Sequence, residues 1–284
     1  ALLNRRVIAV KVDNHPKARP QSGLQEADAV IEIIVEGGFT RFIALFHSSD
    51  SGYVGPVRSV RPTDTAVLPP IDPVLIISGG QTWIQSLANQ RGIQLIGEGS
   101  AGLFRMSHRV APHNLYADTW DARRTADERG YDDDINGGLY AIGEWDKPQE
   151  RATEITLDWA LGNVVTWKFD RGRYWRAVNG VNHSWVDGAD HRAQLAFDVL
   201  VVIEGHQYTA VPPPGGRSSV PAIETLGSGR LLIFSEGRVM EGTWERDAVE
   251  ESFRLFDADG NPVVVPPGIP WISVFPQERS ATWS

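Results

Sequence analysis

The segment AVIEIIVEGGFTRFIALF, residues 29–46, constrains the fold more than any other part of the sequence. Residues 29–35 and 39–46 are rich in β-branched and aromatic side chains, which favour strands, and the Gly37-Gly38 pair between them marks a turn. The two runs therefore predict a β-hairpin. A β-branched run at residues 7–12 predicts one more strand, which precedes the hairpin in the chain.

Helical patterns follow the hairpin. An apolar run at residues 74–77 leads through a Gly-Gly turn into residues 81–91, where the spacing of apolar residues suits a helix. A second helix is predicted over residues 117–130, with Asp118 as its N-cap. Because strands alternate with helices here, residues 1–140 are predicted to form an α/β or α+β domain with a mixed sheet.

The second half of the chain has a different character. Residues 141–160 contain many acidic residues together with Gly and Pro, and they predict a linker. Residues 161–284 contain short β-branched or aromatic runs that are separated by turn sequences such as DRG and DADGN, so a mainly β domain is expected there. The predicted strands are residues 163–169, 174–178, 199–204, 231–234 and 271–274.

Composition limits the function of the chain. The formal net charge of −9 and a pI near 5.3 argue against a broad nucleic-acid-binding surface, so anionic partners are expected only at a local basic pocket. The chain has no cysteine, which excludes disulfides, thiolate zinc sites and a cysteine nucleophile. No apolar run approaches the ~20 residues that span a membrane. We therefore expect a soluble body whose export signal or anchor has been removed.

Carboxylates and guanidinium groups are dense in the first 61 residues. Alternation along a strand predicts that Glu32 and Glu36 share one face of the first hairpin strand. In a structural interpretation, these acids pair with Arg41, Arg58 or Arg61 in a polar core, because an unpaired buried carboxylate is very costly. In a functional interpretation, the same network leaves one arginine open to bind a planar anion such as carboxylate or phosphate.

The segment FRMSHRVAPHNLYAD, residues 104–118, adds a local cationic stretch. Its His113-Asn114 pair follows a proline on a loop that enters the second predicted helix, where side chains and free backbone N–H groups can meet an anion. Arg109 belongs to the same stretch. His15 follows the first predicted strand, a position where α/β proteins often build sites. For each histidine, an ordinary loop residue is the alternative interpretation.

A metal or cofactor site has little support in the sequence. Asp132, Asp134 and Asn136 match the start of a calcium loop, but Gly143 stands where the bidentate glutamate belongs, so they remain a weak metal candidate against a solvated linker. The P-loop, zinc-protease and hydrolase-elbow motifs are missing, and no cofactor is expected. Ser59, between two arginines, has no base that the sequence identifies, so a role as nucleophile is poorly supported.

Three N-terminal segments, DNHPKARPQSGLQEADAVIEIIVEGGFTRFIALF, GPVRSVRP and APHNLY, closely resemble the YerB-like bacterial lipoprotein family. The segments GRYWRAVNGVNHSWVD, GSGRLLIFSEGRVMEGTW and VPPGIPWISVFP are similar to the C-terminal domain of that family. The resemblance implies an extracytoplasmic protein that is lipid-anchored or secreted. It brings no established catalytic role. The recurrent polar residues of the family map onto Asn14, Arg19, Gln21, Glu36, Arg41, Arg58, Arg61, His113 and Asn114.

The sequence leaves three functions open. The first is a protein that binds an anionic envelope component, such as a phosphate- or carboxylate-bearing glycan or polymer, in an N-terminal cleft that presents Arg58 and Arg61; a helical turn at residues 59–65 would direct both guanidinium groups to one anion. The other predicted ligand-binding residues are Asn14, Arg19, Arg41, Arg109, His113 and Asn114. The second is a hydrolase or transferase acting on an envelope glycan or phosphodiester, with His113 or Glu36 as general acid or base. The third is a scaffold that binds another envelope protein. Contact with the membrane is expected only through the removed anchor, and no nucleic-acid partner is expected.

Overall fold

The computed structural model describes residues 5–131, 137–144, 146 and 148–284. Within these residues, ten strands form one mixed sheet that runs through both halves of the chain. They are β1 (Ile8–Asp13), β2 (Ala29–Ile34), β3 (Thr40–Phe46), β4 (Val74–Ile76), β5 (Gln94–Ile96), β15 (Val199–Gly205), β18 (Gly227–Ser235), β19 (Arg238–Arg246), β20 (Arg254–Asp257) and β21 (Pro270–Pro276). Their order in the sheet is β20-β19-β18-β15-β21-β2-β3-β1-β4-β5.

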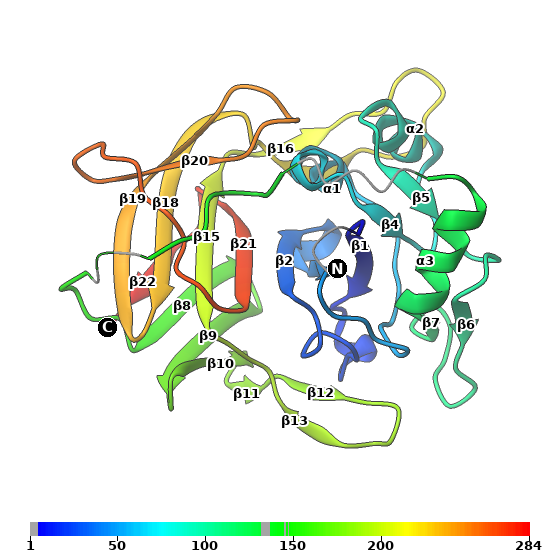
Figure 1. Ribbon diagram of the computed structural model, residues 1–284, viewed down its shortest axis with the longest axis horizontal. Coiled ribbons are helices and arrows are strands. Elements are labelled where there is room, and N and C mark those ends of the chain that lie inside the picture. Colours follow the sequence, from blue (N-terminus) through cyan, green and yellow to red (C-terminus); the bar gives the residue numbers. More distant parts are fainter. Residues whose placement is uncertain (1–4, 132–136, 145, 147) are drawn as a thin grey trace.

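The two halves of the chain meet where β21 lies beside β2 (Figure 1). β21 is parallel to both of its neighbours, with Trp271 opposite Val30 of β2 and opposite Leu200 of β15. β2 and β3 form the predicted antiparallel hairpin, in which Val30 is paired with Ala44. A strand from near the end of the sequence therefore completes the centre of the main sheet.

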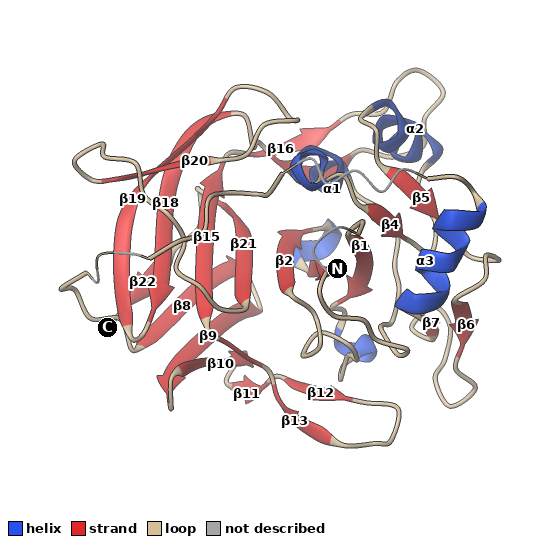
Figure 2. Cartoon of the chain, viewed as in Figure 1, coloured by secondary structure: helices blue, strands red, loops and turns tan. Residues whose placement is uncertain are grey.

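A second, antiparallel sheet packs beside the C-terminal half of the main sheet (Figure 2). Its strands are β8 (Glu154–Ala160), β9 (Asn163–Asp170), β10 (Arg173–Val178), β11 (Val181–Asn182), β14 (Ala196–Phe197) and β22 (Ala281–Trp283). Ile155, Leu157 and Trp159 alternate with less buried residues along β8, as expected for a strand with one face in the core. The predicted linker at residues 141–160 thus includes a full strand of this sheet.

Three short strand pairs and six helical segments complete the described fold. The pairs are β6 (Leu103–Arg105) with β7 (Leu115–Ala117), β12 (Ser184–Val186) with β13 (Arg192–Gln194), and β16 (Gln207–Ala210) with β17 (Val220–Ile223). The helices are α1 (Pro62–Val67), α2 (Thr82–Gln90), α3 (Thr119–Glu128), and the 3-10 turns η1 (Pro16–Ala18), η2 (Glu36–Gly38) and η3 (Pro69–Ile71). The predicted mixed sheet and the predicted prevalence of strands are confirmed.

Local sequence signals account for several of these boundaries. The Asp118 carboxylate accepts hydrogen bonds from the backbone N–H groups of Trp120 (2.9 Å) and Asp121 (3.1 Å), which confirms it as the N-cap of α3. The prediction that Glu36 continues the strand face of Glu32 was wrong. β2 ends at Ile34, and η2 turns the chain through Gly37, whose φ of 72° lies in the left-handed region that glycine adopts without strain.

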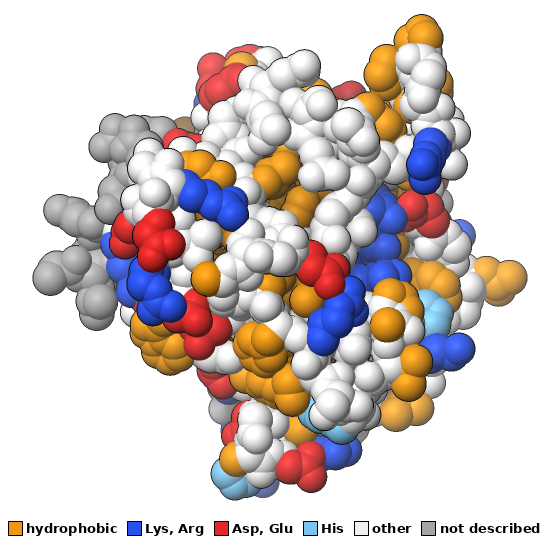
Figure 3. All heavy atoms as spheres, turned by 90° about the vertical axis from the view of Figure 1, so that its right-hand side faces the viewer, with side chains coloured by type: hydrophobic (Ala, Val, Ile, Leu, Met, Phe, Trp, Pro, Cys, Tyr) orange, Lys and Arg blue, Asp and Glu red, His pale blue; other side chains and the backbone are white. Residues whose placement is uncertain are grey.

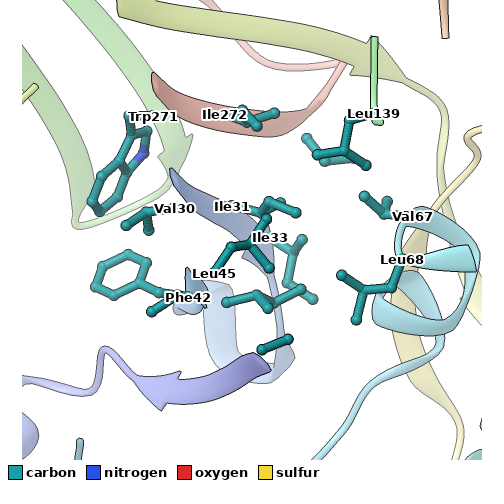
Figure 4. Packing of buried hydrophobic residues seen from close by; sticks show 14 of the residues in the cluster. Val30, Ile31, Ile33, Phe42, Leu45, Val67, Leu68, Leu139, Trp271 and Ile272 are labelled. Carbon is teal, nitrogen blue, oxygen red and sulfur yellow. The ribbon is translucent and has the colours of Figure 1, made fainter. Parts of the chain in front are cut away.

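The hydrophobic core continues across the junction of the two halves (Figure 4). On one side of the sheet, Trp271, Val30 and Phe42 lie together, and the rings of Phe42 and Trp271 meet edge to face at 4.9 Å. On the other side, Ile31 and Ile272 lie towards α1. Because complete burial of one such side chain stabilises a fold by about 1.5–3 kcal/mol, this shared core holds the halves together.

Candidate functional site

The candidate site lies at the carboxyl ends of β1 and β4. These two strands run parallel, and residues 57–60 pass between their ends, where the Arg58 N–H donates to Lys11 O (2.8 Å) and the Ser78 N–H donates to Arg58 O (3.1 Å). Loops at the carboxyl ends of parallel strands are where α/β proteins commonly bind ligands. The chain path therefore brings Arg58 and Ser59 into that position.

Asp13, the last residue of β1, connects the charged groups of this site. Its Oδ2 lies 2.7 Å from His113 Nδ1 and 3.1 Å from Arg58 Nε, although the arginine contact is an ion pair without hydrogen-bond geometry. Its Oδ1 accepts the backbone N–H of His15 at 3.0 Å. Asp13 is almost completely buried, so it holds the His113 ring in a fixed orientation with Nδ1 towards the carboxylate.

His15 stacks on His113 and extends the site away from Asp13. The two imidazole rings are 5.0 Å apart and nearly parallel, and the Phe39 ring lies 4.9 Å from His15. Burial, and next the nearby charge of His113, lower the pKa of His15 below its usual value. His15 Nδ1 accepts the backbone N–H of Lys17 at 3.2 Å, so the side chain also caps η1.

Arg58 and Arg61 contact different carboxylates in this structure. α1 begins at Pro62, after both arginines, so the expected helical turn does not place them on one face. Arg61 forms a bidentate pair with Glu36, with Nε to Oε2 and Nη2 to Oε1 both at 2.8 Å. Arg58 faces Asp13, so each guanidinium group has a carboxylate partner of its own.

The surroundings of Glu36 and Arg41 lower the pKa values of both side chains, for different reasons. Burial acts to raise the pKa of Glu36, but the hydrogen bonds and charge of Arg61 outweigh it and hold the pKa below its usual range. Glu36 is therefore ionised and is poorly suited to be a general acid. Arg41 donates to Ser59 O at 2.8 Å, and its pKa falls to about 10 because it is buried and lies close to Arg61 and Arg58.

Asn14 and Arg19 brace the loop that follows β1. The buried Asn14 side chain donates to Thr40 Oγ1 (2.7 Å) and accepts from Arg19 Nε (2.9 Å) and Gln21 Nε2 (3.1 Å). Burial, followed by the charge of Arg176, lowers the pKa of Arg19 to about 10. These contacts fix the Asn14 side chain and hold the loop after β1 in place.

The loop between β6 and β7 is held against η1 by an arginine. Arg109 donates from Nη1 to Ala18 O (2.8 Å) and from Nη2 to Pro20 O (2.6 Å). Asn114, also predicted to bind ligand, instead accepts a hydrogen bond from Arg105 within its own hairpin. These contacts place His113 and Arg109 beside the loop of Lys17 and Arg19.

A cavity of about 520 Å³ opens between these two loops, and we call it the basic cavity. Its lining consists of Lys17, Arg19, His108, Arg109, Val110, Ala111, Pro112 and His113. None of these lining residues is acidic. In the described part of the chain, the side chains of Lys17 and His108 form no hydrogen bond or ion pair with the protein. The space-filling view shows Lys, Arg and His side chains along the right-hand part of one face, with acidic groups among them (Figure 3).

Sequence reasoning missed several residues of this site. Asp13 was not among the predicted ligands, although its place directly after the apolar run 7–12 was an available signal. Lys17 and His108 were missed because nothing local indicates that their two loops meet. Asp132, Asp134 and Asn136, the weak metal candidate, lie outside the described residues. Among the residues described, no group of three or more His, Asp or Glu side chains is arranged to hold a metal ion.

A buried network connects the site to the C-terminal half. Glu32 of β2 accepts from Thr40 Oγ1 and Arg176 Nη2, both at 2.7 Å, and from Trp271 Nε1 at 3.0 Å. Thr40 in turn accepts from Asn14. His183 contacts Arg176, and burial together with the charges of Arg176 and Arg19 holds the pKa of His183 well below its usual value. The loop after β1 is thus fixed through a chain of buried hydrogen bonds.

The fold and the sequence together define a two-domain protein, and the chain belongs to the family described as "Protein of unknown function (DUF3048)". The model of its N-terminal domain matches residues 1–132 and that of its C-terminal domain matches residues 154–272. None of the described helices is long and apolar enough to cross a membrane.

The chain is similar to a protein of Bacillus subtilis (strain 168) named "Putative lipoprotein YerB", with 30% identity over 292 residues that cover 99% of this chain and 84% of the relative. It is also similar to the crystal structure of the YerB protein from Bacillus subtilis, with a TM-score of 0.82 and 26% identity. That match covers 99% of this chain and 95% of the solved chain. The family resemblance predicted from the sequence is therefore confirmed.

Proposed function

We propose that this protein works outside the cytoplasm, as a lipid-anchored or secreted protein of the cell envelope, and that it binds an anionic envelope ligand in the basic cavity. The name of the Bacillus subtilis relative supports the location. The lining of the basic cavity supports the class of ligand, which is a glycan or polymer that carries phosphate or carboxylate groups.

One observation carries the proposal: five side chains of the basic cavity bear guanidinium, ammonium or imidazole groups and none bears a carboxylate. The chain as a whole has a formal net charge of −9, so this cavity is a local exception that attracts anions. Among the residues that the structure describes, the side chains of Lys17 and His108 have no hydrogen-bonding or ion-pair partner, so both can donate to a ligand. Charge-assisted hydrogen bonds of this kind are the stronger ones in proteins.

The bracing role of Arg109 and Arg19 is compatible with ligand binding. A guanidinium group has five N–H donors, and the two contacts of Arg109 to backbone oxygens use only part of them. The same is true of Arg19, which donates to the side chain and backbone of Asn14. Both guanidinium groups are pre-positioned, which reduces the entropy lost on binding.

We expect Lys17→Ala/His108→Ala to weaken binding of pyrophosphate about tenfold or more, because the variant loses two charge-assisted contacts. Isothermal titration calorimetry at 50 mM and 300 mM salt measures this, and wild-type affinity should fall at the higher salt. Both side chains are exposed, so the melting temperature without ligand should stay unchanged. Lys168→Ala, an exposed lysine on β9, is the matched control. Equal pyrophosphate affinity of wild type and the double variant would contradict the proposal.

A second function is favoured by one specific contact. His113 Nδ1 faces the Asp13 carboxylate at 2.7 Å, which leaves Nε2 as the nitrogen available to exchange a proton with a substrate in the basic cavity. A carboxylate that orients a histidine in this way is a recurrent arrangement in general acid–base catalysis. Hydrolysis or transfer at an envelope phosphodiester or glycan is therefore the alternative function.

If this alternative holds, His113→Gln should lower turnover of bis(p-nitrophenyl) phosphate by about a hundredfold, because glutamine keeps a donor near Asp13 but cannot exchange the proton. Asp13→Asn should also lower the rate, and His191→Gln, an exposed histidine paired with Asp187, should not. Release of p-nitrophenolate is followed by absorbance. A wild-type rate equal to that of His113→Gln would exclude His113 as the acid or base and leave the binding function in place.

A further inference from the structure

A second cavity, of about 840 Å³, lies where the two halves of the chain face each other, and it shares no lining residue with the basic cavity. We call it the junction cavity. One wall comes from the N-terminal half, with Glu36, Arg61 and Trp83, and the facing wall is the loop at residues 213–218 of the C-terminal half. A ligand in the junction cavity would therefore contact both halves at once.

The loop that forms the second wall is fixed by one side chain of the first. Gln81, the N-cap residue of α2, donates from Nε2 to Ser218 O (3.0 Å) and accepts the Ser218 N–H with Oε1 (3.1 Å). The Trp83 indole N–H also donates to Gln81 Oε1, at 3.0 Å. These paired contacts join residues 137 positions apart in the sequence and fix the loop beside α2, and a fixed wall favours binding by pre-organisation.

The lining offers three kinds of contact. Trp83 is partly buried and its N–H already has a partner, so the apolar ring is what it offers to a ligand. The Arg61–Glu36 pair presents planar donors and acceptors side by side. Hydroxyl groups of Ser59, Thr82 and Ser86 complete a wall on which polar and apolar groups are mixed.

This combination matches a sugar ring. A pyranose has one apolar C–H face, which packs on an indole ring, and a rim of hydroxyl groups that both donate and accept hydrogen bonds, as the Arg61–Glu36 pair does. A cavity of this volume lies within the usual range of about 300–1,000 Å³ for small-molecule sites and has room for more than one sugar ring. An inorganic anion would fill only a small part of it.

The charges of the cavity refine the class of sugar. Arg61 is neutralised by Glu36, whereas Arg217 of the facing loop is exposed and forms no hydrogen bond or ion pair with any described residue. The lining thus has two guanidinium groups against one carboxylate. We propose that the junction cavity binds a saccharide that carries an acidic group, with Trp83 under the ring and Arg217 beside the acid.

Calorimetry and saturation-transfer NMR of the whole chain measure whether saccharides bind in the junction cavity. The carboxylate probe is trigalacturonate, the phosphate probe is maltose 1-phosphate, and the neutral probe is maltotriose. At least one acidic probe should show saturable binding. Trp83→Ala should weaken its binding about tenfold. Arg217→Ala should remove most of the preference for acidic over neutral probe, because it takes away the unpaired charge. The two acidic probes decide between carboxylate and phosphate as the acid.

Matched controls separate this site from other surfaces. Trp120→Ala, an exposed tryptophan on α3, and Arg124→Ala, an exposed arginine on the same helix, should leave binding unchanged. Lys17→Ala/His108→Ala should also leave saccharide binding unchanged, so the proposals for the two cavities are tested independently. If Trp83→Ala melts at a lower temperature, Trp83→Phe and the loop variant Arg217→Ala still test the site in a folded chain. No saturation by either acidic probe, or saturation that Trp83 and Arg217 variants do not alter, would overturn the proposal.

Discussion

Arg176→Ala should lower the free energy of unfolding by about 3–5 kcal/mol, because it leaves the Glu32 carboxylate buried without its cation. Both side chains are 0% exposed, and Arg176 Nη2 lies 2.7 Å from Glu32 Oε1. The guanidinium carbon also lies 4.8 Å from the centre of the Trp271 ring and 5.5 Å from that of Trp167, so the substitution removes cation–π contacts as well. Urea unfolding followed by circular dichroism at pH 7 measures the loss.

Two further variants show whether the lost stability comes from the unpaired charge. Arg176→Met/Glu32→Gln removes both charges and keeps much of the buried volume, so it should recover most of the stability. Arg254→Ala, an exposed arginine that pairs with Asp247, should leave the midpoint nearly unchanged. If Arg176→Ala unfolds at the same urea concentration as wild type, the buried pair does not hold the two halves together.

The second large expected effect is a rise in the free energy of unfolding with pH, caused by Lys11. Lys11 is completely buried beside Asp64, with Nζ 2.6 Å from Oδ1, and burial lowers its pKa from 10.5 to about 8 despite the attraction of that carboxylate. Between pH 8 and 10.5 the unfolded chain holds the Lys11 proton and the folded chain has lost it. Because the unfolded state binds more protons in this window, Lys11 makes the folded state more stable as the pH rises. The two pKa values correspond to a gain of about 3 kcal/mol.

A double variant isolates this gain from other titrating groups. Lys11→Met/Asp64→Asn has no charge at the pair, and the asparagine oxygen still accepts the Arg61 N–H, which Asp64 accepts at 2.7 Å. Unfolding in urea is compared at pH 7, 8, 9 and 10. Wild type should gain stability relative to the double variant over this series, whereas Lys168→Met should follow wild type. Parallel curves for wild type and the double variant would show that Lys11 keeps its proton in the folded state.

Local sequence patterns predicted the strands and helices of this fold, but they did not predict which of these elements lie side by side. The hairpin of β2 and β3, the Asp118 cap and the strands of the second half follow from turn residues, capping and alternation, which act over a few positions. The pairing of β2 with β21 joins residues 29–34 to residues 270–276, and such a distant pairing leaves no local signal. Sequence patterns therefore gave no indication that one sheet unites both halves.

The partners of the polar residues could not be predicted from local patterns either. Placing Glu36 on a strand assumed that alternation continues, but the turn through Gly37 takes this side chain to Arg61. Arg58 and Arg61 were expected to serve one anion because they are three positions apart, and in the structure Arg58 faces Asp13 whereas Arg61 pairs with Glu36. The partner of Glu32 was missed because Arg176 comes from the other half of the chain. Ligand binding by the predicted residues stays a prediction.

The position of β21 also affects when the main sheet can be completed during synthesis of the chain. Its neighbours β2 and β15 are translated earlier, but each lacks a partner on one side until residues 270–276 have been synthesised. Pairings between such distant segments form slowly because a long loop must close first. The ten-stranded sheet therefore stays in two parts, one ending at β2 and the other at β15, until residues 270–276 join them.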